Sequence, residues 1–135
     1  MVEPIEGFSA VTVHVRDIQV ARKFYREVLG LHEEGFTEQT GRAVYSFPGT
    51  PTILAMHVQR PGEGGREPGT VTGIILAHHD PRAAVEEIRR RGGTITVEPV
   101  EVPGPGGTMV RAAFADPDGN EFVISSGHAS APPKS

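Results

Sequence analysis

The chain has 135 residues, and its 13 Lys and Arg residues against 17 Asp and Glu residues give a formal net charge of −4. This length predicts a single domain, and the negative charge argues against a nucleic-acid partner. The absence of cysteine excludes disulfides and cysteine-ligated zinc. No apolar run reaches the roughly 18 residues of a membrane span, and the N-terminus lacks the apolar core of a secretory signal. We therefore expect a cytoplasmic protein with no membrane partner.

The first half of the chain reads as a strand, a helix and three more strands. Residues 9–16 alternate and are rich in β-branched side chains, which is typical of a strand. Asp17 then stands where a helix N-cap belongs, residues 18–29 carry an apolar stripe at helical spacing, and Gly30 ends the helix. The three further strands are predicted at 32–37, 42–47 and 52–58.

The second half repeats this order after a Gly/Pro-rich connector at 60–69, which we interpret as a mobile loop between two halves. Residues 70–79 read as a strand, and Asp80 caps a helix that has a proline in its first position and ends at a Gly-Gly pair. A turn-forming Asp-Pro-Asp-Gly sequence joins the last two strands, and the tail at 127–135 is predicted to be unstructured. The strands expected after the helix lie at 94–100, 108–115 and 120–125.

An internal repeat relates the two halves. Asp17 and Asp80 are separated by the same 63 positions as Gly30 and Gly93, so each half is predicted to form one βαβββ module. One module alone would leave a sheet face and a helix stripe poorly buried. We therefore expect an α+β fold in which two modules form a curved mixed sheet around a cavity, with the helices outside. The cavity-facing residues of the first strand are then Ala10, Thr12, His14 and Arg16.

Two motifs in this order resemble the vicinal oxygen chelate superfamily, which includes the glyoxalases I, extradiol dioxygenases, fosfomycin-resistance thiol transferases and bleomycin-binding resistance proteins. They are VTVHVRDIQVARKFYREVLGL at 11–31 and FADPDGNEFVIS at 114–125. The segment HHDPRAAVEEIRRRGG at 78–93 strengthens the resemblance, which covers nearly the whole predicted fold. It implies a symmetric homodimer. It also implies one domain, made of a first module at about 8–59, the connector at 60–69 and a second module at about 70–126.

In metal-dependent members of that superfamily, His or Glu side chains on the first and last strands of each module hold a divalent ion, which acts as a Lewis acid toward two substrate oxygens. The resemblance places these positions at Ala10 and Gly73, seven residues before each capping Asp, and at Val123, four residues after the glycine of the turn. None of these side chains can ligate an ion. The fourth position, in the strand around 53–57, cannot be aligned. We therefore expect no cofactor, with a divalent metal as the alternative.

Two classes of function stay open. We favour a binding module, similar to bleomycin resistance proteins, that holds a small organic molecule in the cavity. The alternative is a lyase or dioxygenase, either with a shifted metal site at His14, His57 and Glu121 or with metal-free acid–base catalysis by His14, Arg16 and Glu121, in which an imidazole acts as the base. The side chains predicted to contact a ligand are Thr12, His14, Tyr45, Met56, His57, Met109, Arg111 and Val123.

Overall fold

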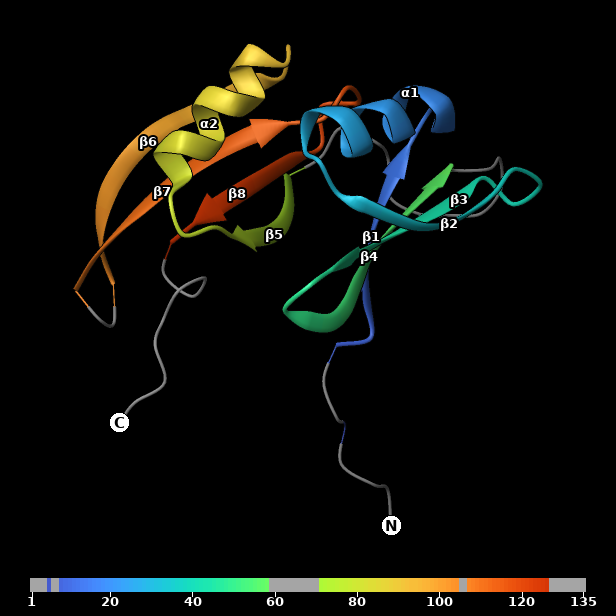
Figure 1. Ribbon diagram of the computed structural model, residues 1–135, viewed down its shortest axis with the longest axis horizontal. Helices are drawn as coiled ribbons and strands as arrows, with labels where there is room; N and C mark the ends of the chain where they lie inside the picture. The colour runs from blue at the N-terminus through green and yellow to red at the C-terminus, as the bar shows by residue number, and fades with distance from the viewer. Residues whose placement is uncertain (1–4, 6–7, 59–70, 105–106, 127–135) are drawn as a thin grey trace.

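Two modules lie side by side in the computed structural model (Figure 1). The structure describes residues 5, 8–58, 71–104 and 107–126, so the predicted connector at 60–69 and tail at 127–135 lie outside the described residues. Within that part of the chain, no helix is long and apolar enough to cross a bilayer.

The first module forms a four-stranded sheet with one helix. Its strands pair in the order β1-β4-β3-β2, parallel between β1 and β4 and antiparallel elsewhere. Its elements are β1 (Ala10–Val15), α1 (Ile18–Lys23), a π-helical turn η1 (Phe24–Val28), β2 (His32–Thr37), β3 (Arg42–Phe47) and β4 (Thr50–Val58).

The second module has the same topology. Its strands pair in the order β5-β8-β7-β6, again parallel only between the first and last strands of the module. The predicted duplication and the α+β fold are therefore confirmed, with strand pairing confined to two separate sheets. The elements are β5 (Val71–Ala77), α2 (Pro81–Arg90), β6 (Thr94–Gly104), β7 (Gly107–Ala115) and β8 (Glu121–Ser125).

Both helices begin at the predicted aspartates. The Asp17 Oδ1 accepts hydrogen bonds from the backbone N–H groups of Gln19 (2.9 Å) and Val20 (3.2 Å), and the Asp80 Oδ1 accepts one from Ala83 (3.2 Å). These bonds satisfy N–H groups that have no partner inside the helix. At the end of α2, a side chain at Gly93 would place its Cβ 2.4 Å from the Ile88 Cγ2, so only glycine fits there.

Two elements differ from the sequence-based expectation. The predicted helix at 18–29 is α-helical only to Lys23 and then widens into the π-helical turn, in which the N–H of Leu29 donates to the carbonyl of Phe24 at 3.1 Å. The strand predicted at 94–100 continues as β6 to Gly104, into the segment PGPGG at 103–107 that its proline and glycine residues predict to be a loop, because cross-strand bonding to β7 continues to the Gly104–Gly107 pair. Proline and glycine content alone therefore overestimated the loop.

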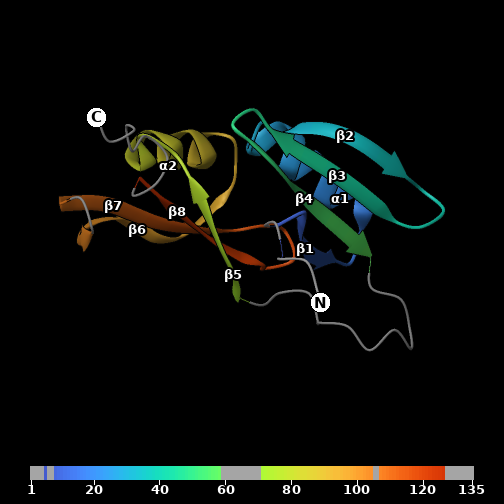
Figure 2. The ribbon, with the colours of Figure 1, turned by 90° about the horizontal axis from the view of Figure 1, so that it is seen from below.

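Each helix covers one face of its sheet, and the core lies between them (Figures 1 and 2). Strand pairing puts Val13, Met56 and Ala43 in one row on the helix-covered face of the first sheet, and all three are buried. A single cluster of buried apolar residues continues from these strands through Phe24 and Tyr25 to the second module. Burial of this cluster is the main force that stabilises both modules.

A charged cluster ties α1 to the edge of the first sheet. Arg22 forms two parallel hydrogen bonds with Glu33, from Nε (2.9 Å) and Nη2 (2.8 Å), and its guanidinium lies 3.8 Å from the ring centre of Phe36. The hydroxyl of Tyr45 donates to the same carboxylate at 3.1 Å. The hydrogen bonds from Arg22 hold the pKa of Glu33 below its ordinary value of 4.5, while burial and the Glu33 charge raise the pKa of Tyr45.

Glu33→Gln is expected to lower the free energy of unfolding by about 1–2 kcal/mol at about pH 7. Because the pKa of Glu33 is lower in the folded protein than in the unfolded chain, its carboxylate stabilises the fold at pH values above the unfolded-state pKa. This stabilisation is lost as the pH falls through the folded-state pKa. The difference between wild type and variant should therefore shrink at about pH 3.5, measured by urea unfolding. Glu34→Gln, which changes an exposed neighbour, is the control. An equal difference at both pH values would contradict this origin.

The two modules meet where β1 and η1 contact the turn between β7 and β8. The buried hydroxyl of Tyr25 donates to the Asp116 Oδ2 at 2.8 Å, and the Asn120 Nδ2 donates to the carbonyl of His14 at 2.8 Å. Tyr25 also packs edge-on against Phe122, with ring centres 6.1 Å apart. The Asp-Pro-Asp-Gly turn therefore joins two strands and also fixes one module against the other.

Candidate functional site

The face of each sheet that is turned away from its helix, which we call the open face, carries most of the predicted site residues. On the second sheet, one row across all four strands consists of Val97, Ala113, Val123 and Ile75. Val97 and Ile75 are exposed although both are large and apolar. The open face of the second sheet is therefore largely uncharged along this row.

The open face of the first sheet is more polar. His14 and His57 are neighbours on β1 and β4, with ring centres 6.4 Å apart, and Arg42 on β3 lies beside His57. The Arg42 Nε donates a hydrogen bond to the His57 Nε2 at 3.0 Å. That bond occupies the Nε2 lone pair that a metal ion would need, and it places the positively charged Arg42 guanidinium beside the His57 ring. The geometry therefore favours hydrogen bonding by this face over ion binding.

The positions that hold metal in the superfamily do not fit an ion in this chain. Ala10 pairs with Ile53 on β4, the strand in which the fourth position could not be aligned, so its neighbour there is apolar. Val123 lies between two further apolar residues, Ile75 and Ala113. Gly73 has φ of +77°, a conformation in which a histidine side chain would be strained. Among the described residues, no three His, Asp or Glu side chains lie together as a possible metal site.

Six of the eight predicted ligand contacts lie on the open faces, as strand pairing shows for Thr12, His14, His57, Met109, Arg111 and Val123. Tyr45 and Met56 do not share this placement. Both are fully buried on the helix-covered face, paired with Leu54 and Ala43. These two residues were expected to contact the ligand, but the register of β3 and β4 turns their side chains toward α1.

Arg16 and Glu121, the two remaining candidates for catalysis, lie at the end of β1 and at the start of β8. The exposed side chain of Arg16 forms an ion pair with Asp118 at 3.1 Å, and its backbone N–H donates to the same carboxylate. Glu121 begins β8 on the open face, paired with Val71 and Ala115. Arg16 therefore contacts the second module through Asp118.

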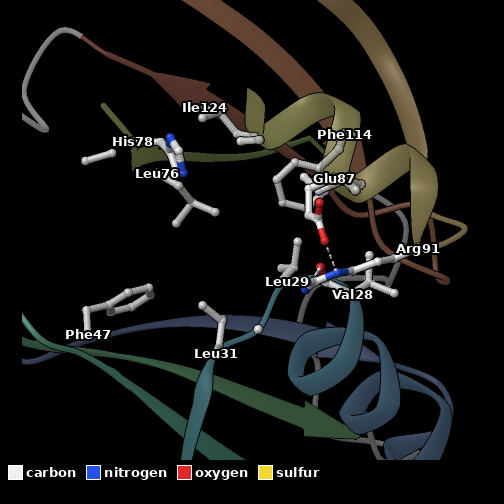
Figure 3. A pocket seen from close by; sticks show the side chains of 14 residues that line it. Val28, Leu29, Leu31, Phe47, Leu76, His78, Glu87, Arg91, Phe114 and Ile124 are labelled. Carbon is white, nitrogen blue, oxygen red and sulfur yellow. Dashed lines mark hydrogen bonds and ion pairs between the residues drawn. The ribbon is translucent and has the colours of Figure 1, made fainter. Parts of the chain in front are cut away.

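A cleft of about 420 Å³ lies on the other side of the sheets, between the two modules (Figure 3). Leu76 and Ile124 project into it from the second module, and Leu31 and Phe47 face them from the first. A second chamber of about 580 Å³ adjoins it and shares Phe47, Leu76, Ala77 and His78 as walls. The sequence did not predict this cleft, because helical and strand periodicity shows which face of an element is apolar but not how completely that face is covered.

Two charged side chains of the lining form an ion pair at one end of the cleft. The Arg91 Nε contacts the Glu87 Oε2 at 2.7 Å (Figure 3). The Arg91 Nη1 also donates to the carbonyls of Glu27 (3.3 Å) and Val28 (3.2 Å), which end the π-helical turn. This arginine is thus a bridge between α2 and η1, and it shares the Glu87 carboxylate with the exposed side chain of Arg90.

Comparison with known proteins agrees with this architecture. Residues 7–124 match the family model for the Glyoxalase/Bleomycin resistance protein/Dioxygenase superfamily. A member of that superfamily from Sphaerobacter thermophilus is 32% identical, with 90% of this chain and 97% of that chain covered and a TM-score of 0.75. A virulence protein from Salmonella typhimurium is 28% identical, with 91% and 98% covered and a TM-score of 0.67.

A third solved structure shares the fold at lower identity. TnmS3, an antibiotic binding protein from Streptomyces sp. CB03234, is 24% identical, with 90% of this chain and 96% of that chain covered and a TM-score of 0.76. The family match spans most of the sequence, and the duplicated modules are those that the sequence predicts. This chain belongs to the Glyoxalase/Bleomycin resistance protein/Dioxygenase superfamily.

Proposed function

We propose that this protein binds a small organic molecule over the open faces of its sheets without using a metal ion. The observation that carries the proposal is the replacement of the superfamily's ion-holding positions by Ala10, Gly73 and Val123, with Ile53 beside the first of them. Such a surface binds through shape, apolar contact and a few hydrogen bonds. The structural neighbour TnmS3, an antibiotic binding protein, supports the proposal because it has the same fold.

The two open faces offer a ligand different chemistry. Met109 and Val123 on the second sheet offer apolar contact, whereas His14, His57 and Arg42 on the first sheet offer hydrogen bonds. We therefore propose an amphipathic ligand, with an apolar or aromatic body and polar substituents. The proposed contacts are Thr12, His14, His57, Met109, Arg111 and Val123.

We also propose a homodimer in which a second copy packs over the open face of the second sheet. Four large apolar side chains are exposed on that face, which is an unfavourable arrangement for an isolated chain. Burial by a second copy would remove them from water and close the ligand cavity. The residues concerned are Val71, Ile75, Val97 and Val100.

A thermal-shift screen of small aromatic metabolites and antibiotics tests the proposed function, because a ligand that binds the native state raises the melting temperature. A ligand at about 100 times its Kd is expected to add about 2.7 kcal/mol of stability. This shift should persist in the presence of EDTA. Thr12→Trp, which fills the exposed open face, should weaken binding by at least about tenfold, whereas Gln19→Trp on the outside of α1 should not.

Metal titration decides between this function and a metal-dependent enzyme. The binding protein is expected to take up no Ni²⁺ or Zn²⁺ at micromolar concentration. Stoichiometric metal binding that is lost in His14→Ala, together with ligand binding that EDTA abolishes, would contradict the proposal and favour a shifted metal site.

A further inference from the structure

We propose that the cleft between the modules is a second binding site, which takes an uncharged, mostly apolar organic molecule with one hydrogen-bond acceptor. It is distinct from the open faces because neighbouring residues on the same strands point to opposite sides. Leu76 and Ile124 line the cleft, whereas Ile75 and Val123 lie on the open face. The two sites are thus separated by the thickness of one sheet.

The apolar lining of the cleft is incompletely covered. Val28, Leu29, Leu31, Phe47 and Leu76 pack against the core cluster but are only partly buried. A volume of about 420 Å³ falls within the range of small-molecule sites, which are mostly apolar with few polar groups. A ligand that fills the cleft would remove this apolar surface from water, which is the source of affinity.

The π-helical turn explains why the cleft is open. The turn ends at Val28, and Gly30 then takes φ of +72° so that the chain can reverse into β2. Leu29 and Leu31 are carried on this reversal and face α2 across the cleft (Figure 3). Arg91 bridges the same reversal to α2 and fixes the width at that end.

The charges of the lining specify an uncharged ligand. Among the residues that line the cleft, the guanidinium of Arg91 and the carboxylate of Glu87 pair with each other, and Arg90, which also contacts that carboxylate, lies outside the lining. The lining therefore presents one positive and one negative group at that end, already in contact. His78 stands at the junction of the two chambers. Its Nδ1 accepts the backbone N–H of Asp80 at 2.9 Å. In the neutral imidazole, the proton is then on Nε2, which is a donor available to an acceptor on the ligand.

Prodan is a suitable probe, because it is an uncharged naphthalene with one carbonyl group whose fluorescence moves to the blue in apolar surroundings. It is expected to bind the full-length protein at one equivalent per chain. Ala84→Phe, which extends a half-buried side chain from α2 into the cleft, should weaken binding at least about tenfold. Ala83→Phe, one position away and exposed on the same helix, is the matched control and should bind as wild type does.

A second pair of variants tests the polar contact. His78→Leu should weaken binding by about five- to tenfold, the effect of losing one hydrogen bond. His32→Leu, which changes an exposed histidine on β2 away from both chambers, should leave it unchanged. If Ala84→Phe fails to fold, Phe47→Ala provides the same test of where prodan binds. It removes a side chain that lines both chambers and should also weaken prodan binding.

The open-face variant separates this inference from the proposed function. Thr12→Trp should leave prodan binding in the cleft intact. Loss of prodan binding in Thr12→Trp but not in Ala84→Phe or Phe47→Ala would overturn the cleft site while leaving the open-face function standing. Tighter binding of an anionic naphthalene sulfonate than of prodan would also overturn it, since the lining would then carry uncompensated positive charge.

Discussion

Asp116→Ala is expected to lower the free energy of unfolding by about 4 kcal/mol, a large part of the 5–15 kcal/mol typical of a domain. The Asp116 Oδ2 accepts hydrogen bonds from the Tyr25 hydroxyl (2.8 Å) and the Asn120 Nδ2 (2.9 Å). Its Oδ1 accepts the backbone N–H groups of Asp118 (3.0 Å) and Asn120 (2.8 Å). Removal of the carboxylate leaves these donors without their acceptor in a buried place.

The effect should extend beyond the turn, because Tyr25 belongs to the first module and Asp116 to the second. Burial, followed by the Asp116 charge, raises the pKa of Tyr25 well above its ordinary value, so the phenol remains a donor across the physiological range. Asn120 in turn holds the carbonyl of His14. Loss of Asp116 is therefore expected to loosen the fit between the modules as well as the hairpin.

Thermal and urea unfolding measure this effect. The melting temperature of Asp116→Ala should fall by more than about 10 °C, whereas Tyr25→Phe, which removes one of the hydrogen bonds, should cost about 1 kcal/mol. Glu86→Ala removes an exposed carboxylate of α2 and should change stability by no more than about 0.5 kcal/mol. Equal losses in Asp116→Ala and Glu86→Ala would show that the buried network does not hold the modules together.

Ile75→Asp is expected to convert the proposed homodimer into a monomer. Ile75 is 52% exposed in the isolated chain and lies in the apolar row on the open face of the second sheet. If a second copy covers this row, the variant must bury an unpaired carboxylate in an apolar interface. The dissociation constant of the dimer should rise by at least about 100-fold.

Sedimentation velocity over a concentration series measures this change. Val20→Asp is a matched control, because Val20 is a similarly exposed apolar residue (50%) that lies on α1 and not on the open face. It should sediment as wild type does. Ile75→Asp should keep the circular dichroism spectrum of wild type, since its side chain is exposed before assembly. A wild-type protein that is monomeric at every concentration, or equal dissociation in both variants, would contradict the proposed interface.

The local features of the fold could be predicted from sequence because they depend on neighbouring residues. Asp17 and Asp80 cap helices wherever those helices pack, and Gly30 and Gly92 adopt the positive φ that their positions require. The common spacing of 63 positions, from Asp17 to Asp80 and from Gly30 to Gly93, predicted two copies of one module, and the strand pairing confirms it. The π-helical turn was missed, since a change from α to π hydrogen bonding leaves the apolar stripe almost unaltered.

The candidate site was only partly predictable. Alternation along β1 assigned Thr12 and His14 to one face correctly, because side-chain direction alternates within any strand. The direction of Tyr45 and Met56 depends on the register of β3 and β4 against β1, and a shift of one residue reverses it. The sequence showed no such register, so two core residues were assigned to the cavity.

The sequence by itself determined the caps, the repeated βαβββ order and the superfamily, and its resemblance to that superfamily placed Ala10, Gly73 and Val123 at the positions that hold an ion in metal-dependent members. Those depend on residue identity and short-range spacing. Only the tertiary structure decided that Arg42 hydrogen-bonds His57, that Asp116 joins both modules, and that the apolar stripes of two helices leave a cleft between them. These features bring together residues distant in the chain, and their positions follow from how the two modules pack.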